Sequence, residues 1–357
     1  MRPEGQPSGV IQKAVSSPYS RIRDVLAISE FSNGPAPRQD QCTTESSAPS
    51  PDSKTDPIRV AVAGLGTVGA ALVRAIEDDP RFELTAVLVR DPARARAVKP
   101  KIAPITDAAA FAASEADIFV DALSSDEVGL AVSRAVLARG KSLASASKRV
   151  IDAEYVALAQ LARDHGAQLR FSAAVGGGAP VLETVAEARS AGNIARIDAV
   201  LNGTLNYLLH EIERGTDFQS ALETAQAAGL AEADPTNDLS GADATAKSRI
   251  VAAEAFGHAP DDYPVMVEPL TPARAAEIAA SGVRYVQACV IKPTCATVSL
   301  VPADGFAGDV PDGEGNVATI ALEGGQRFSC HGPGAGGEPT AEAIMGDLRA
   351  IAAELAR

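Results

Sequence analysis

Metal-ligand patterns of cysteine and histidine are missing from this sequence of 357 residues. The four cysteines, Cys42, Cys289, Cys295 and Cys330, form no CxxC pair, and the four histidines show neither ligand spacing nor pairing with a nucleophile. The pattern therefore indicates neither a zinc site nor a disulfide framework. Reduced thiols in a cytosolic protein are the interpretation that it favours.

Long apolar runs, aromatic side chains and positive charge are also scarce. No run approaches the about 20 residues that a transmembrane helix needs, and no charged-then-apolar leader opens the chain, so we expect no membrane span and a cytoplasmic location. Aromatic residues make up 4% and tryptophan is absent, so alanine and small aliphatic side chains must fill the core. A net charge of −14 argues against nucleic-acid binding, which needs clustered Lys and Arg.

The first 56 residues differ in composition from the rest. They are rich in Ser, Pro, Gln and Thr and show little apolar periodicity. Such a segment buries too little apolar surface to offset the entropy cost of ordering, so we expect residues 1–56 to be a disordered tail. A transit peptide and an overlong predicted start are alternatives, although acidic residues among the few Arg and Lys argue against the transit peptide.

Ordered structure is predicted from Ile58 onward. The run IRVAVAGLG is typical of a strand that is buried on both faces of a parallel sheet. The runs LTAVLV, DIFVDAL and KSLASAS follow, separated by helical patterns such as residues 67–77 and VGLAVSRAVLARG, and LRFSAAVGG is a candidate fifth strand. This alternation predicts an α/β fold over residues 57–180, a Rossmann-type doubly wound parallel sheet with ligands at the carboxyl ends of its strands.

A second, α+β domain is predicted over residues 181–330. Its helical patterns are VLETVAEARSA, TLNYLLHEIERG, DFQSALETAQAAG and DATAKSRIVAAEAFG, and its strand-like segments are RIDAVL, RYVQACVI, ATVSLVP and VATIALEG. The glycine-dense segment HGPGAGGEP then precedes a final amphipathic helix, AEAIMGDLRAIAAELA. We expect this helix to pack back onto the first domain, so that residues 331–357 complete it.

A G-x-G-x-x-G motif lies between the first strand and the first helix. Gly64 permits the tight turn, Gly66 lets the backbone approach a pyrophosphate, and Gly69 allows the helix to pack closely on the strand. The helix N-terminus faces the anion, so we expect Thr67 and Val68 to join the glycines in binding a dinucleotide. The alternative is that the glycines only shape the turn.

The end of the second predicted strand, VLVRDP, is where a Rossmann fold selects its cofactor. Arg90 there favours the 2′-phosphate of NADP, whereas Asp91 beside it would suit the ribose hydroxyls of NAD. We therefore expect NADP, with NAD open as an alternative. The alternative is that Arg90 and Asp91 play no part in cofactor binding and form a solvated pair on a loop.

Acidic residues cluster between Gly229 and Lys247, in the segment GLAEADPTNDLSGADATAK. In a helix that starts near Ser240, Asp243 and Lys247 would be i, i+4 partners, and their simplest role is an ion pair on the surface. A location in a cleft would change this interpretation. There, carboxylates could bind a substrate ammonium, and the lysine could transfer the proton that accompanies hydride transfer.

Six segments together resemble the homoserine dehydrogenase family in order and spacing: AVAGLGTVG, SASKRV, AAVGGGAP, LNGTLNY, AEADPTNDLSGADATAK and GPGAGGEPTA. The resemblance covers about residues 57–357. It implies reversible, NAD(P)-dependent interconversion of L-homoserine and L-aspartate 4-semialdehyde, a step of threonine and methionine biosynthesis. It also implies a homodimer built through the sheet of the second domain.

The resemblance assigns roles to individual residues. Lys247 matches the lysine that protonates the carbonyl oxygen, and Asp243 matches a carboxylate that contacts the substrate one helical turn earlier. Glu232 matches the substrate-binding glutamate, and Asp238 is also expected near the substrate. In chemical terms, an ammonium stabilises and protonates the oxygen on which hydride delivery builds charge.

Further matches concern the cofactor. Lys148 matches the lysine of a TxNK-like motif near cofactor and substrate, although Ser147 replaces its asparagine. Ser124 matches a hydroxyl at the nicotinamide side, and Gly229 and Gly336 match backbone positions that approach the cofactor. Lys148 is therefore a candidate for both catalysis and cofactor binding.

Family members often bind a monovalent cation such as sodium with a glutamate and backbone carbonyls. The carbonyls of Val175, Gly177 and Ala179 match these ligands, but Ser172 replaces the glutamate and removes the strongest electrostatic contribution. The alternative is that VGGGAP is only a flexible turn between domains.

Two other functions stay open. The chain could be a related NAD(P)-dependent reductase of another semialdehyde or amino acid, which Ser147 and Ser172 would allow. It could also be a catalytically silent, cofactor-binding paralogue, although the joint presence of Lys148, Glu232 and Lys247 argues against this. Since the chain does not continue into the regulatory domain of many members, we expect no feedback inhibition through such a domain.

Overall fold

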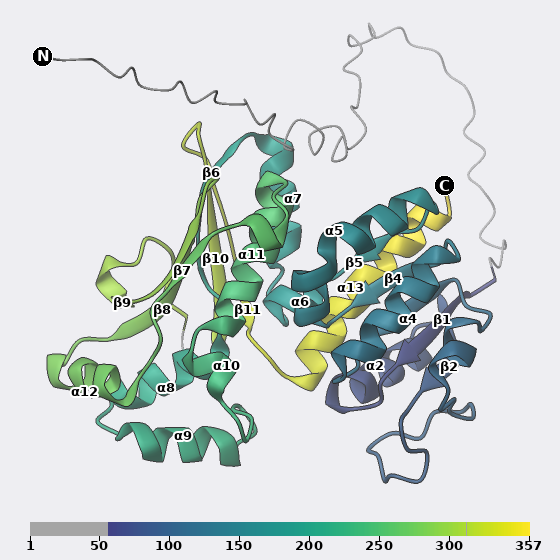
Figure 1. The fold of residues 1–357 in the computed structure, drawn as a ribbon, viewed down its shortest axis with the longest axis horizontal. Helices are drawn as coiled ribbons and strands as arrows, with labels where there is room; N and C mark the ends of the chain where they lie inside the picture. Colours follow the sequence, from purple (N-terminus) through teal and green to yellow (C-terminus); the bar gives the residue numbers. More distant parts are fainter. Residues whose placement is uncertain (1–55, 312) are drawn as a thin grey trace, which may run out of the picture. The chain divides into compact units, whose positions relative to one another are not determined.

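The computed structural model describes residues 56–311 and 313–357. The disorder predicted for residues 1–56 therefore falls, except for Asp56, outside the described residues. The described chain contains one five-stranded and one six-stranded sheet (Figure 1).

The first sheet is parallel and has the strand order β2-β1-β3-β4-β5, which confirms the predicted doubly wound α/β fold. The direction of winding reverses between β1 and β3, so the crevice beyond the carboxyl ends of these two strands is the expected ligand site. The strands are β1 (Ile58–Ala63), β2 (Phe82–Leu88), β3 (Ile118–Asp121), β4 (Ser142–Ser145) and β5 (Leu169–Arg170).

Helices cover both faces of this sheet, as alternating side chains of β1 require. Val60 and Val62 belong to the apolar cluster that contains α2 (Thr67–Asp78) and α13 (Gly337–Leu355). Ala61 and Ala63 belong to the cluster that contains the other helices. Figure 1 shows the C-terminal helix α13, in yellow, returning to this sheet, where it packs against α2. The remaining helices of this part are α3 (Ala108–Ala112), α4 (Asp126–Ala138) and α5 (Lys148–Asp164).

The prediction of a fifth strand over LRFSAAVGG is wrong for most of its length. Only Leu169–Arg170 are extended, and Ser172–Gly176 form the short helix α6. The backbone amide and the hydroxyl of Ser172 donate to the carboxylate of Asp347 on α13, at 3.0 and 2.8 Å. This carboxylate satisfies an amide at the start of α6 that would otherwise lack a partner. Local sequence contains no sign of a cap that is supplied by a distant helix.

The second sheet has the order β11-β10-β6-β8-β9-β7, and all its pairs are antiparallel except β7 with β9. The sequence patterns predict β6, β8, β9 and β10, but not the edge strands β7 and β11. Its strands are β6 (Ile194–Val200), β7 (Val265–Val267), β8 (Tyr285–Ile291), β9 (Ala296–Pro302), β10 (Gly315–Leu322) and β11 (Arg327–Pro333).

The helices of the second part fall into two groups. α7 (Val181–Ala191) and α11 (Ala242–Phe256) share one apolar cluster with both sheets, which makes the core continuous between them. α8 (Gly203–Glu213), α9 (Phe218–Ala227) and α12 (Pro272–Ser281) enclose a separate cluster. The remaining short helices are α10 (Thr236–Leu239), η1 (Pro260–Asp262) and η2 (Ala303–Gly305).

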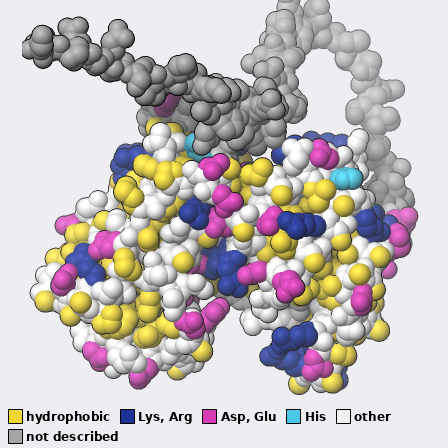
Figure 2. Space-filling view, viewed as in Figure 1, with side chains coloured by type: hydrophobic (Ala, Val, Ile, Leu, Met, Phe, Trp, Pro, Cys, Tyr) yellow, Lys and Arg dark blue, Asp and Glu magenta, His cyan; other side chains and the backbone are white. Residues whose placement is uncertain are grey.

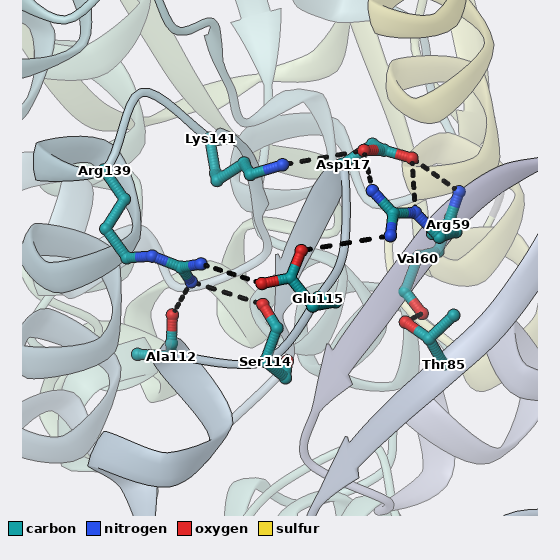
Figure 3. Close-up of polar contacts among 9 residues, drawn as sticks. All are labelled: Arg59, Val60, Thr85, Ala112, Ser114, Glu115, Asp117, Arg139 and Lys141. Carbon is teal, nitrogen blue, oxygen red and sulfur yellow. Dashed lines mark hydrogen bonds and ion pairs between the residues drawn. The ribbon is translucent and has the colours of Figure 1, made fainter.

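Ion pairs connect the amino ends of β1, β3 and β4 (Figure 3). The guanidinium of Arg59 donates to both carboxylate oxygens of Asp117, at 3.1 and 2.9 Å, and Lys141 Nζ lies 3.6 Å from Asp117 Oδ1. The hydrogen bond from Arg59 is the main cause that lowers the pKa of Asp117. Because this edge is opposite the carboxyl ends of the strands, the network stabilises the sheet and leaves the ligand crevice free.

Candidate active site

The glycine turn between β1 and α2 is shaped by two close contacts and one open space. Gly64 has φ of +99°, and a Cβ there would lie 2.4 Å from the carbonyl oxygen of Ala122. A Cβ on Gly69 would lie 2.0 Å from the oxygen of Gly64. A Cβ on Gly66 would meet nothing within 4 Å. The packing requires the first and third glycines, while the second leaves open space at the helix N-terminus, the place where a Rossmann fold generally binds a pyrophosphate.

Two further segments adjoin this turn. Ala122 leads into the loop after β3, whose residues Leu123 and Ser124 line a cavity. A Cβ on Gly337, at the start of α13, would lie 2.8 Å from Thr67 Cγ2, which places the neighbouring Gly336 close to the turn. The glycine turn therefore borders the cavity.

This cavity measures about 630 Å³ and receives side chains from both sheets and their helices. The cavity brings together residues that were predicted for catalysis, substrate binding, cofactor binding and cation binding: Ser124, Lys148, Val175, Gly177, Glu232, Asp238, Asp243 and Lys247. Arg90, Ala179, Gly229 and Gly336 are not among the described residues that line it.

Asp243 lies between two lysines. Its Oδ2 is 3.0 Å from Lys247 Nζ, its Oδ1 accepts a hydrogen bond from Lys148, and Lys247 also donates to the carbonyl of Leu201 at 2.6 Å. The side chains of Asp243 and Lys247 are only 3% and 10% exposed, so the interpretation as a surface ion pair is wrong. Burial opposes ionisation of Asp243, but the two ammonium groups prevail and lower its pKa.

The backbone explains how these three side chains meet. Asp243 and Lys247 are one turn apart on α11, which begins after Gly241. Gly241 has φ of +78°, and a Cβ there would lie 2.5 Å from Val267 Cγ2, so this turn needs glycine. Lys148 is the first residue of α5, which begins shortly after β4. The two lysines thus come from helices that pack on different sheets.

The carboxylates of the loop between α9 and α11 differ in environment. Glu232 is exposed, and its carboxylate makes no hydrogen bond or ion pair with any described residue. Asp238 accepts a hydrogen bond from Asn202 Nδ2 at 3.0 Å, while burial, followed by the charge of Asp243, raises its pKa. Asn202 in turn caps α8 by accepting the amide of Leu205 at 2.9 Å. Glu232 is therefore available to a ligand cation.

Sequence reasoning missed several polar residues of the cavity. Asn202 lies in the segment LNGTLNY, where an asparagine before a helical pattern is a cap signal that could have identified it. Arg149, Asp152 and Arg249 also line the cavity, and Arg249 Nη1 lies 3.7 Å from Asp152 Oδ2. These residues belong to helices whose facing sides the sequence alone does not reveal.

Arg90 lies on the loop that follows β2 and is exposed. Four more basic residues follow within this loop, and Figure 2 shows Lys and Arg side chains gathered over it. The carboxylate of Asp91 accepts the amide of Ala93 at 2.9 Å and so shapes the turn. The loop therefore presents an excess of positive charge beyond the end of β2.

The VGGGAP segment is packed into the interior. Val175 and Ala179 are buried, and a Cβ on Gly177 would lie 2.5 Å from the oxygen of Gly334. The alternative of a flexible turn does not agree with this burial. In residues 56–311 and 313–357, no group of three or more His, Cys, Asp or Glu side chains is placed to hold a metal. Within the same part of the chain, no helix has the length and apolar character that crossing a bilayer requires.

Comparisons with known proteins identify the family of the chain. Residues 64–172 match the family model for the NAD-binding domain of homoserine dehydrogenase, and residues 180–348 match the family model for homoserine dehydrogenase itself. The homoserine dehydrogenase of Mycobacterium leprae is 33% identical over 320 residues, which cover 82% of this chain and 71% of that protein. That of Pseudomonas aeruginosa is 30% identical over 313 residues, with the same coverage.

The fold comparison leads to the same family. The crystal structure of a homoserine dehydrogenase from Thiobacillus denitrificans superimposes with a TM-score of 0.74 at 28% identity. The match covers 83% of this chain and 73% of that one. On these grounds the chain belongs to the homoserine dehydrogenase family of NAD(P)-dependent oxidoreductases.

Proposed function

We propose that this chain interconverts L-homoserine and L-aspartate 4-semialdehyde reversibly. The observation that carries the proposal is the group formed by Lys148, Asp243 and Lys247 at the wall of the cavity. Reduction of an aldehyde builds negative charge on its oxygen, and a positioned ammonium stabilises that charge and supplies a proton. A bound nicotinamide cofactor supplies the hydride donor for this direction and the hydride acceptor for the reverse.

Lys247 is the proposed proton donor to the carbonyl oxygen, and it takes the proton back when the alcohol is oxidised. An ammonium has three N–H donors. Asp243 and the Leu201 carbonyl engage two of those of Lys247, which leaves the third for the substrate oxygen. Asp243 holds both lysines and contacts the substrate, and Lys148 adds a second positive charge beside cofactor and substrate.

Glu232 and Asp238 are proposed to bind the substrate ammonium. Both line the cavity, and the carboxylate of Glu232 has no partner among the described residues. An exposed carboxylate without a partner can bind an ammonium without first losing another interaction. Holding this end of the substrate orients its reacting carbon.

The cofactor is proposed to lie along the glycine turn. Gly64, Gly66, Thr67, Val68 and Gly69 hold its pyrophosphate at the N-terminus of α2, where the space next to Gly66 supports the assignment.

Other residues complete the proposed cofactor site. Ser124 and Lys148 lie at the nicotinamide end, and Gly336 adjoins the turn through its neighbour in α13. Gly229 is also assigned to the cofactor, although it does not line the cavity. Arg90 and its basic loop favour NADP over NAD because a 2′-phosphate adds negative charge at this place.

The predicted cation site is also part of the proposal. The carbonyls of Val175, Gly177 and Ala179 are its ligands. Ser172 brings no charge to the site, and both of its donors are engaged by Asp347. The proton-transfer roles of the lysines do not depend on a cation.

We also propose two domains, a homodimer and a cytoplasmic location for this chain. Residues 57–180 with 331–357 bind the dinucleotide, and residues 181–330 bind substrate and form a homodimer. The exposed apolar side chains Met266 and Val267, on the edge strand β7 of the second sheet, support an interface there. The enzyme is proposed to act in the cytoplasm, in threonine and methionine biosynthesis. Light scattering of the purified chain tests the dimer.

A single assay tests the reaction. Purified protein incubated with L-homoserine and either NADP or NAD should increase the absorbance of the reduced cofactor. The faster cofactor identifies the preference. Absence of reduction with both cofactors, in protein that unfolds cooperatively, would reject the proposed activity.

A further inference from the structure

The two lysines of the site meet only because two helices from different parts of the molecule pack together. Lys148 begins α5, which covers the first sheet, whereas Asp243 and Lys247 belong to α11, which packs on the second. α5 and α11 contact each other directly. The place of the Lys148 ammonium relative to Asp243 is therefore set by this helix junction.

A hydrogen bond joins the two helices farther along their length. The hydroxyl of Tyr155 on α5 donates to Glu254 Oε1 on α11 at 2.8 Å. Tyr155 follows Lys148 by about two helical turns. Burial, followed by the charge of Glu254, raises the pKa of Tyr155, so its hydroxyl stays protonated and able to donate.

Both partners of this bond are held from the side. The ring of Tyr155 packs edge-to-face on Phe171, with centroids 5.8 Å apart and an angle of 85° between the rings. The backbone oxygen of Glu254 accepts a hydrogen bond from Arg189 Nη1 of α7 at 2.7 Å. Because neither end is free to follow the other, the bond restricts sliding of α5 on α11.

We infer that Tyr155 and Glu254 are positioning residues, whose hydrogen bond keeps α5 where the Lys148 ammonium reaches the carboxylate that also holds Lys247. Neither belongs to the described residues that line the cavity, so neither contacts the substrate. The inference rests on the catalytic role proposed above for Lys148.

Another polar pair crosses the same junction between these two points. Arg249 Nη1 lies 3.7 Å from Asp152 Oδ2, which is an ion-pair distance but too long for a good hydrogen bond. The other carboxylate oxygen of Asp152, Oδ1, has no hydrogen-bond partner among the described residues. The bond between Tyr155 and Glu254 is shorter and directional, and so it restricts the helices more closely.

The replacement of Tyr155 by phenylalanine tests the inference, since it removes the hydroxyl and keeps the ring on Phe171. A displacement of about 1 Å in a catalytic group can cost up to about 10²-fold in rate. We expect Tyr155→Phe to lower kcat about tenfold, while KM and the Kd of the cofactor stay unchanged. Glu254→Gln keeps an acceptor oxygen for the hydroxyl and should retain nearly the kcat of the wild type.

Tyr263→Phe is the matched control. Its hydroxyl also makes a single hydrogen bond, to the Lys292 carbonyl at 2.5 Å, but does not join α5 to α11. We expect this variant to lose thermal stability and keep its kcat. If Tyr155→Phe behaves in the same way, the hydrogen bond only stabilises the fold and the inference is overturned.

Lys148→Met separates this inference from the proposed function. Retained turnover in Lys148→Met would reject the catalytic role of Lys148 and the inference with it. If Lys148→Met loses turnover but Tyr155→Phe does not, only the positioning role fails. In the Lys148→Met background, Tyr155→Phe should have no further effect on kcat. A full tenfold loss there would show that Tyr155 acts through another group, which also overturns the inference.

Discussion

Replacing Lys247 by methionine tests the central group of the proposed mechanism. The substitution keeps an unbranched side chain of similar length and removes the ammonium. In the structure this ammonium is 3.0 Å from Asp243 Oδ2 and 2.6 Å from the Leu201 oxygen. The variant therefore leaves Asp243 with Lys148 as its remaining cationic partner.

Two magnitudes follow from this geometry. A positioned acid–base group contributes about 10²- to 10⁴-fold to a rate, so turnover should fall at least about 10²-fold. Removing one partner of a buried ion pair costs about 3–5 kcal/mol when the other charge is left uncompensated. Lys148 still compensates Asp243, and we therefore expect a loss of only about 1–3 kcal/mol in the free energy of unfolding.

The assay compares three properties of the same preparation: the initial rate of homoserine oxidation, the Kd of the cofactor and thermal unfolding. We expect loss of turnover with little change in cofactor binding, because Lys247 lies on α11 and the glycine turn precedes α2. The double variant Asp243→Asn/Lys247→Met should recover stability without recovering turnover. A folded Lys247→Met protein that turns over like the wild type would remove Lys247 from the mechanism.

Four further substitutions test other parts of the structure. Gly66→Ala should leave thermal stability unchanged, since its Cβ meets nothing within 4 Å, but should weaken cofactor binding at least about tenfold by filling the pyrophosphate space. Gly64→Ala should destabilise the fold itself, and identical behaviour of the two variants in calorimetry and cofactor titration would contradict this reading of the turn. Arg90→Ala should raise the Kd of NADP about 10- to 100-fold, because a charge-assisted hydrogen bond contributes about 1.5–3 kcal/mol. The Kd of NAD should stay unchanged. Equal losses of affinity for both cofactors would place the 2′-phosphate elsewhere. For Asp347, burial raises the pKa to about 6. Between its unfolded value near 4 and this value, the folded chain binds more protons than the unfolded chain, so ionisation of Asp347 reduces stability as the pH rises through this window. Asp347→Asn removes this dependence. Between pH 4 and pH 7, the free energy of unfolding of the variant, measured in urea and compared with that of the wild type, should rise by on the order of 3 kcal/mol. A constant difference between the two proteins would count against a raised pKa of Asp347.

The sequence alone determined the features that depend on neighbours along the chain. The glycine turn was predictable because Gly64, Gly66 and Gly69 lie between a buried strand pattern and a helix pattern, and both are local periodicities. The pairing of Asp243 with Lys247 was predictable because residues four apart share one face of a helix. The family resemblance added roles for these residues that periodicity cannot supply.

Only the tertiary structure decided which distant groups share one environment. Lys148 and Asp243 are 95 residues apart and Ser172 and Asp347 are 175 apart, yet each pair is hydrogen-bonded. The second pair lies at the start of a helix in a segment where the sequence predicts a strand. The pair of Asp243 and Lys247 was likewise expected at the surface, but both side chains are buried and line a cavity. The physical reason is that hydrogen-bond partners and solvent exposure depend on which helices pack together, and a one-dimensional pattern records only which face of a helix is apolar.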